Sequence, residues 1–410
     1  MNRDNQISDM RPKILILMHY MELGGAESAL LGLLQSVDPE RADVDVFIYS
    51  HRGELMKYIP KDCVRLLPEV TDYRLIERPI AECLLSGKWG IALGRIAAKW
   101  TVGKSPVPEG KEDIRIFARI ADCVEPFLPN ISPDVEYDLA ISFLIPHNYV
   151  LKKVRAKRKM GWIHTDYSTV YVDVERELGV WGQLDWIASI SEEVGKKFAG
   201  IFPTLADKIV PIENILNTSF IRDRADEGSS FLCSDNDVVK LLTIGRFSYP
   251  KKMEDIPQIC RLVRERGVKV KWYIIGYGNN QIEETVRTNA RKEGVEDDVI
   301  LLGKQDNPYP FIKSCDIYVQ PSRYEGKSIT VREAQILARP VVVTDYPTAA
   351  SQVQTGVDGI IVPMDVQECA DRLAEFIMDT ERRDRIALYL REHDYGNENE
   401  IEKIYKMASV

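Results

Sequence analysis

The amino-acid sequence predicts an α/β protein with two doubly wound domains, each built on a parallel sheet. At 410 residues the chain is too long for a single small core. Short apolar runs alternate with segments of helical apolar spacing, which is the pattern of parallel strand–helix–strand units. This pattern stops at the polar stretch 222–237 and then begins again. We therefore expect two similar halves.

The first half begins with an apolar strand at 13–20. The following "GGAESALLGLLQSV" has the apolar spacing of a helix, and the pair Gly24-Gly25 opens it. Residues 74–127 are mostly helical in pattern and form an insertion. The other strands expected in this half lie at 43–50, 138–145, 158–165 and 185–191.

The second half repeats the pattern, with strands expected at 240–247, 271–278, 299–304, 316–322, 340–345 and 359–363. We expect an N-terminal domain at 1–215, a C-terminal domain at 216–390, and a final helix in 391–410 for which a return to the N-terminal domain is one arrangement. In such architectures ligands bind beyond the carboxyl ends of the strands. The expected site is therefore a central cleft that both sheets face.

Composition excludes several classes of protein. The net charge of −9 argues against a nucleic-acid partner. No apolar run reaches the 18 residues or so of a membrane-spanning helix. Seven scattered cysteines without a C-x-x-C pair are typical of a reduced, cytoplasmic protein, and the polar N-terminal stretch lacks the layout of a signal peptide. A cytoplasmic location is the expectation.

The stretch "EGKSITVREA" places two carboxylates, Glu325 and Glu333, eight residues apart. If Glu325 lies in a loop after a strand and a helix begins near Ser328, the glutamate and the helix N–H groups could meet one ligand. A purely local interpretation remains open, in which Ser328 is an N-cap and Thr330-x-x-Glu333 is a capping box.

A second stretch, "GRFSYPKK", places Arg246 and Lys251 at the carboxyl end of an expected strand. Two cations there suit a diphosphate, because arginine offers a fork of donors and lysine a point charge. The alternative is a solvated loop. The helix N-termini at Gly24-Gly25 and at Ser328 would add backbone N–H groups for an anion.

A histidine, His164 in "GWIHTDY", ends a strand of the first half and so faces the same expected cleft. Asp43-Val44-Asp45 resembles a metal-binding D-x-D, but it opens a strand at the opposite edge of the sheet, so we interpret it as strand-entry polarity. No H-E-x-x-H, Cys/His cluster or G-x-S-x-G appears in the sequence. Metal and serine-hydrolase chemistry have no support, and no metal or cofactor is expected.

In this order the motifs resemble those of the retaining GT-B glycosyltransferases of family four, the glycosyl transferases group 1 of bacterial polysaccharide biosynthesis. The resemblance runs from "GGAE" (24–27) to "VDGIIVP" (357–363) and is densest over 240–363. It implies the GT-B fold, in which two Rossmann-like domains face a central cleft. It also implies a hexosyltransferase that takes its sugar from a nucleoside diphosphate, with UDP-sugar as the expected donor.

The resemblance implies a role for each part of "EGKSITVREA". Glu333 would bind the ribose hydroxyls of the donor, and Glu325 would bind hydroxyls of the sugar. The backbone N–H groups between them would contact the sugar and phosphate, namely those of Gly326, Lys327, Ser328 and Ile329.

It also implies roles outside that stretch. Arg246 and Lys251 would hold the diphosphate, and Gly24-Gly25 would approach it from the first half. His164 would lie beside the sugar and the incoming hydroxyl. Retention would follow a front-side path in which the leaving phosphate helps to accept the acceptor's proton, with no metal.

The expected acceptor is a glycan or a polyprenyl-diphosphate-linked glycan. Residues 84–104 mix cations with leucines and two tryptophans, and six cations lie within 152–159. Such a mixture is typical of an interfacial helix, so we expect a peripheral contact with an anionic membrane. The alternative is that both stretches are solvated or core-facing helix faces.

Two departures from the family pattern leave the sugar open. Lys327 and Ser328 stand where an aromatic or aliphatic residue and then Gly or Pro are frequent, and "DYPTAASQV" (345–353) replaces a glycine-rich loop that ends in glutamate. Two other functions remain as alternatives. One is a non-hydrolysing nucleotide-sugar epimerase and the other is a non-catalytic GT-B partner protein.

Overall fold

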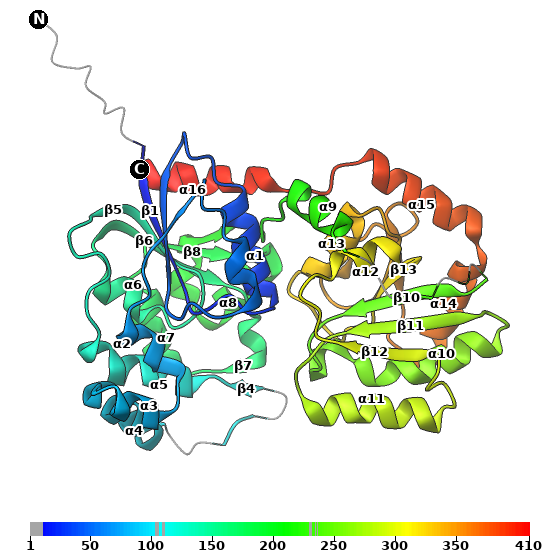
Figure 1. The fold of residues 1–410 in the computed structure, drawn as a ribbon, viewed down its shortest axis with the longest axis horizontal. Coiled ribbons are helices and arrows are strands. Elements are labelled where there is room, and N and C mark those ends of the chain that lie inside the picture. Colours follow the sequence, from blue (N-terminus) through cyan, green and yellow to red (C-terminus); the bar gives the residue numbers. More distant parts are fainter. Residues whose placement is uncertain (1–10, 103–105, 109–110, 229–231, 234, 236) are drawn as a thin grey trace, which may run out of the picture. The chain divides into compact units, whose positions relative to one another are not determined.

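The computed structural model describes residues 11–102, 106–108, 111–228, 232–233, 235 and 237–410. The chain forms two compact units (Figure 1). The first comprises Met1–Ile215 and Glu398–Val410, and the second comprises Leu216–Asn397. The second boundary, expected at 390/391, thus lies at 397/398.

The first unit contains a seven-stranded sheet in the order β3-β2-β1-β5-β6-β8-β9, and all of its strand pairs are parallel. Five of the six residues of β1 and of β2 are buried, which is typical of a sheet covered on both faces. The strands are β1 (Lys13–Met18), β2 (Asp43–Ile48), β3 (Arg65–Leu66), β5 (Tyr137–Ser142), β6 (Ala156–Ile163), β8 (Trp186–Ser189) and β9 (Ile209–Pro211).

The principal helices of this unit are α1 (Gly25–Gln35), α6 (Asn148–Lys153), α7 (Val174–Trp181), α8 (Glu192–Ile201) and α16 (Ile401–Ala408). The last of these comes from the end of the chain and packs on the first unit. The backbone N–H of Asp38 donates to Tyr405 Oη at 2.8 Å, and Arg41 forms an ion pair with Glu402. The chain therefore returns to its first unit.

The insertion expected at 74–127 is largely helical. Its elements are α2 (Thr71–Arg74), α3 (Ile80–Leu85), α4 (Trp89–Thr101) and α5 (Arg115–Val124), and a short strand, β4 (Glu112–Asp113), which pairs with β7 (Val170–Tyr171). Helices α4 and α5 pack closely against each other, and a Cβ atom added to Gly94 of α4 would lie 2.5 Å from the carbonyl oxygen of Cys123 in α5.

The second unit contains a six-stranded parallel sheet in the order β12-β11-β10-β13-β14-β15. The chain runs outward in one direction from β10 to β12 and in the other from β13 to β15, so the topological switch point lies between β10 and β13. Ligands of such sheets bind at that point, beyond the carboxyl ends of the strands. The strands are β10 (Val239–Ile244), β11 (Val270–Ile275), β12 (Val299–Gly303), β13 (Ile317–Gln320), β14 (Val341–Thr344) and β15 (Gly359–Val362).

Helices cover both faces of this second sheet (Figure 1). One apolar core joins it to α10 (Ile256–Glu265), α11 (Asn280–Lys292), α14 (Val366–Met378) and α15 (Thr380–Glu392). A second core joins it to α9 (Thr218–Asp226), α12 (Tyr309–Ser314) and α13 (Ile329–Ile336). The predicted fold class, two α/β units with parallel sheets, is confirmed.

Candidate active site

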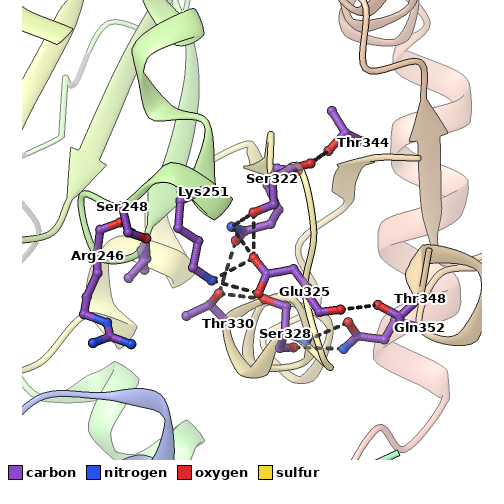
Figure 2. Close-up of polar contacts among 12 residues, drawn as sticks. Arg246, Ser248, Lys251, Ser322, Glu325, Ser328, Thr330, Thr344, Thr348 and Gln352 are labelled. Atoms are coloured by element: carbon purple, nitrogen blue, oxygen red, sulfur yellow. Dashed lines mark hydrogen bonds and ion pairs between the residues drawn. The ribbon is translucent and has the colours of Figure 1, made fainter. Parts of the chain in front are cut away.

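Two loops at the switch point of the second unit bring the predicted motifs together (Figure 2). The loop after β10 carries Arg246 and Lys251, and the loop after β13 leads through Glu325 to α13. Lys251 Nζ donates to both carboxylate oxygens of Glu325, at 2.7 and 2.9 Å. Residues 74 positions apart in the sequence thus form one ion pair.

Arg323 forms further contacts between the same two loops. The sequence did not indicate this role for Arg323. Its backbone N–H donates to the carbonyl oxygen of Pro250 at 2.7 Å, and its guanidinium donates to the carbonyl oxygen of Tyr249 at 2.7 Å. The guanidinium also pairs with Glu254 at 2.8 Å. The loop that carries Lys251 is therefore held at several points.

The carboxylate of Glu325 is held rigidly. Besides Lys251, Ser322 Oγ donates to Oε1 at 2.6 Å and Gln320 Nε2 donates to it at 3.1 Å. The side chain is 9% exposed. Because a carboxylate oxygen accepts hydrogen bonds, these donors fix the direction of the side chain.

The segment "DYPTAASQV" (345–353) forms hydrogen bonds with the backbone of the Glu325–Ser328 loop. Thr348 Oγ1 donates to the carbonyl oxygen of Glu325 at 2.9 Å. Gln352 makes two bonds to Ser328, because its Nε2 donates to the carbonyl oxygen at 2.9 Å and its Oε1 accepts from the N–H at 2.8 Å. The two stretches that depart from the family pattern thus contact each other (Figure 2).

The helix α13 begins at Ile329, directly after Ser328, as the sequence predicted. The local interpretation that the sequence left open holds only in part, because Ser328 occupies the N-cap position of α13. The Ser328 side chain makes no capping bond to the first turn. The capping box is absent too, because Thr330 Oγ1 accepts from Tyr318 Oη at 2.7 Å and Glu333 bonds elsewhere. The first turn of α13 therefore lacks a side-chain cap, which suits an external anion.

Glu333 lies inside α13 and is 4% exposed. Tyr309 Oη donates to its Oε1 at 3.0 Å. Burial raises the pKa of Glu333 to about 7, against the opposing effect of the Tyr309 hydrogen bond. The two carboxylates of "EGKSITVREA" therefore have different environments, since Glu325 is ion-paired and Glu333 changes charge near neutral pH.

Arg246 is exposed and extends away from the Glu325 carboxylate (Figure 2). Within the described parts of the chain, no ion pair or side-chain hydrogen bond involves its guanidinium. The structure therefore presents one cation bound internally, Lys251, and one directed to solvent. Such an arrangement can accept an anion with little loss of existing contacts.

In the first unit, Gly24 precedes α1 in an extended conformation, and Gly25 is the first residue of the helix. A Cβ atom on Gly24 would lie 2.3 Å from Oε2 of Glu27, so a larger residue there would displace that carboxylate. The glycine pair thus opens the helix as predicted.

His164 follows the last residue of β6, at the carboxyl edge of the first sheet. Its ring packs on Phe143 and Trp162, with centroid distances of 4.5 and 5.7 Å. Burial lowers the pKa of His164 to about 3. The imidazole is therefore neutral at physiological pH and would act as a hydrogen-bonding group rather than as a cation.

The D-x-D stretch lies at the amino end of β2, as interpreted from the sequence. Asp43 pairs with Arg11 at 3.0 Å, and Asp45 accepts from Arg65 Nε at 2.7 Å and from Tyr137 Oη at 2.7 Å. Across the described residues, no group of three or more His, Cys, Asp or Glu side chains could share a metal ion.

Residues 239–379 match the family described as Glycosyl transferases group 1. The second unit belongs to the group 1 glycosyl transferases. The match includes Arg246, Lys251, Glu325 and Glu333, whereas Gly24, Gly25 and His164 lie outside it.

Curated relatives resemble the group 1 unit over a limited length. The putative glycosyltransferase EpsF of Bacillus subtilis is 27% identical over 136 residues, which cover 33% of this chain and 34% of EpsF. The capsular polysaccharide biosynthesis glycosyltransferase CapM of Staphylococcus aureus is 26% identical over 167 residues, which cover 40% of this chain and 43% of CapM. The similarity thus spans well under half the length of these relatives.

A solved structure resembles this chain over almost its whole length. HepE of Anabaena, in complex with UDP-glucose, superposes with a TM-score of 0.65 at 17% identity, and the match covers 97% of this chain and 98% of that one. At this identity the likeness shows the fold alone. The fold is GT-B.

Proposed function

We propose that the protein is a retaining glycosyltransferase that transfers a hexosyl unit from a nucleoside-diphosphate sugar, with UDP-sugar as the proposed donor. One observation carries the proposal. At the switch point of the group 1 unit, one loop carries Arg246 and Lys251, and the next leads through Glu325, which pairs with Lys251, to the start of α13, the helix that contains Glu333. These groups match the parts of such a donor.

The cations and the helix would bind the diphosphate. Arg246 is directed to solvent, and Lys251 can be shared between Glu325 and a phosphate. Cleavage of the sugar–phosphate bond places negative charge on the leaving diphosphate. Arg246, Lys251 and the N-terminus of α13 would stabilise that charge as it develops.

The carboxylates would bind the two ends of the donor. Glu333, inside α13, would accept hydrogen bonds from the ribose hydroxyls, and Glu325 would accept them from hydroxyls of the sugar. Glu325 loses part of its ion pair when Lys251 turns to the phosphate, and a sugar hydroxyl would replace that donor. The backbone N–H groups of Gly326, Lys327 and Ile329 would complete the contacts to sugar and phosphate. The N–H of Ser328, which the sequence also suggested for this role, donates instead to Gln352 Oε1 at 2.8 Å.

The first unit would supply the groups near the acceptor. His164, neutral at physiological pH, would hydrogen-bond the sugar or the incoming hydroxyl, and Gly24-Gly25 would approach the diphosphate. The proposed reaction keeps the configuration of the sugar by a front-side path and requires no metal, because the cations and the helix already neutralise the leaving group.

The proposed acceptor is a glycan or a polyprenyl-diphosphate-linked glycan in cell-surface polysaccharide biosynthesis. The names of CapM, a capsular polysaccharide glycosyltransferase, and of HepE in complex with UDP-glucose support the pathway class and the donor. We place the protein in the cytoplasm with a peripheral contact to the inner face of the membrane. None of the helices in the described parts is long and apolar enough to cross a membrane.

A panel of nucleoside-diphosphate sugars, tested first by thermal shift and then with glycan acceptors by mass spectrometry, examines the proposal. A binding donor should raise the melting temperature, because it binds only the native state. Transfer should depend on the acceptor and should fail in Arg246→Ala. Conversion of the donor to another sugar without an acceptor would indicate an epimerase instead. Donor binding without any transfer or conversion would favour the non-catalytic alternative.

A further inference from the structure

Helix α4 presents large apolar side chains to solvent along one face. Trp89, Leu93, Ile96 and Trp100 are spaced by four, three and four residues, so they lie on one side of the helix. We call these four residues the α4 stripe. Their exposed fractions are 63%, 61%, 38% and 87%, and Leu85 at the end of α3 is 89% exposed. An ordinary surface helix places polar residues on this face.

The opposite face of α4 is made mostly of small residues that pack closely on the insertion. Ile91, Ala92, Gly94 and Ala98 are buried. A Cβ atom on Gly94 would lie 2.5 Å from the carbonyl oxygen of Cys123, and one on Gly90 would lie 2.4 Å from the ring of Phe127. The backbone of α5 leaves no room for a side chain at Gly94, so this face of α4 is closely packed. The packing holds the α4 stripe outward.

The charge of this region favours an anionic partner. Residues 83–101 contain three cations and no Asp or Glu, although the whole chain has a net charge of −9. Lys99 is exposed. Lys88 is 38% exposed and donates to Asp72 at 2.7 Å, while Arg95 donates inward to the carbonyl oxygen of Arg78. Lys99 is thus the cation best placed to contact a surface, with Lys88 as a partial contributor.

The cations of the second cationic stretch, 152–159, bind partners within the protein, which favours the alternative that the sequence left open for this stretch. All six cations have partners within the first unit. Lys152 and Lys153 pair with Glu125, Lys157 with Asp138 and Arg158 with Asp185, and Arg155 and Lys159 donate to backbone carbonyl groups. The contact expected with a membrane therefore has its strongest support at α4.

We propose that the α4 stripe is the surface by which the first unit docks on the interface of an anionic lipid bilayer. Tryptophan is enriched at that interface, where its ring meets both apolar and polar groups. From Trp89 to Trp100 the stripe extends about 16 Å, at 1.5 Å per residue, along a helix that lies on the protein surface. The aromatic and aliphatic side chains enter the interface, and Lys99 meets lipid phosphates. The docking does not depend on the donor or on the reaction proposed above.

Vesicle co-sedimentation of the full chain tests this assignment, with vesicles of phosphatidylcholine alone or mixed with phosphatidylglycerol. The double variant Trp89→Ser/Trp100→Ser should bind the anionic vesicles about 10- to 100-fold more weakly, because two large apolar side chains are lost. The matched control Met378→Ser/Leu388→Ser removes two residues of the second unit that are 59% and 51% exposed. It should leave binding unchanged. Lys99→Glu should weaken binding to the anionic vesicles but not to the vesicles of phosphatidylcholine alone.

Two further measurements keep the result interpretable. Circular dichroism and UDP-sugar binding of each variant show whether the fold and the donor site are intact, so a failure here is separate from a failure of the proposed function. Sedimentation velocity shows whether the stripe joins two copies of the chain. The proposal would be overturned if the wild type did not bind anionic vesicles, or if the tryptophan variant bound them as well as the wild type. It would also be overturned if the wild type were a dimer in solution and the tryptophan variant a monomer.

Discussion

Replacing Glu333 by glutamine tests the ribose-binding role through pH. The pKa of Glu333 is about 7. The carboxyl is therefore about 90% ionised at pH 8 and about 10% ionised at pH 6. If the ionised form binds the ribose, the affinity of the wild-type protein for a UDP-sugar should fall about tenfold from pH 8 to pH 6. Glu333→Gln should weaken binding at pH 8 by about 1–3 kcal/mol and abolish this pH dependence.

Titration calorimetry at pH 6, 7 and 8 measures the effect. A UDP-sugar is the appropriate ligand, since both of its phosphates are esterified and neither has the ionisation near pH 6 of a terminal phosphate. Tyr309→Phe is the matched control, because it removes the hydrogen bond that lowers the pKa of Glu333. Its pH midpoint should move above that of the wild type. Equal wild-type affinity at pH 6 and pH 8 would refute the reasoning, as would a tenfold change that persists in Glu333→Gln.

The same carboxyl should make the stability of the protein depend on pH. Folding raises the pKa of Glu333 from its ordinary value of 4.5 to about 7. The native state then binds the proton more tightly, so this contribution is complete below pH 4.5 and is lost as the pH rises through 7. The full shift corresponds to about 3 kcal/mol. The melting temperature of Glu333→Gln should accordingly fall less than that of the wild type between pH 5 and pH 8.

Three other outcomes follow from the site. His164→Ala should lower turnover far more than donor affinity, and wild-type turnover with weakened nucleotide binding would contradict its position beside the transferred sugar. Turnover should survive EDTA, whereas loss on chelation that Mg²⁺ or Mn²⁺ restores would contradict the metal-free reaction. Gln352→Ala should reduce stability by about 1–3 kcal/mol and lower turnover, because it leaves the N–H and carbonyl of Ser328 without their side-chain partner. Gln354→Ala, at an exposed residue nearby, should change neither the stability nor the turnover.

The fold could be predicted from the sequence because apolar periodicity and glycine positions act locally. Alternating strand and helix patterns indicated parallel sheets in both units, and the pair Gly24-Gly25 marked the start of α1. The end of the second unit was less accurate. Residues 391–397 stay with the second unit, and the final helix begins only at Ile401.

The site could be predicted only in part. The sequence indicated that Lys251 and Glu325 would both lie at a carboxyl edge, but their ion pair depends on the positions of two loops. Gln320, Ser322, Arg323, Thr348 and Gln352 were not identified as parts of it, since their roles are hydrogen bonds between segments distant in the chain.

Local rules failed where tertiary contacts compete with them. Thr330 and Glu333 have the spacing of a capping box. Their side chains instead accept hydrogen bonds from Tyr318 and Tyr309, respectively. Only the fold brings those two tyrosines to α13. The cations of 152–159 illustrate the same limit, because the sequence showed their charge but not the carboxylates that pair with them.

Titration calorimetry of the wild type and Arg246→Ala with UDP-sugars tests most directly the central claim, that the group 1 unit binds a nucleoside-diphosphate sugar. Arg246 has an exposed guanidinium, so its removal leaves no buried group without a partner. Arg372→Ala, at a 64% exposed side chain in α14 of the same unit, is the matched control. The account predicts a loss of about 1–3 kcal/mol of binding free energy in Arg246→Ala and no loss in Arg372→Ala. Equal donor affinity in the wild type and Arg246→Ala would contradict it.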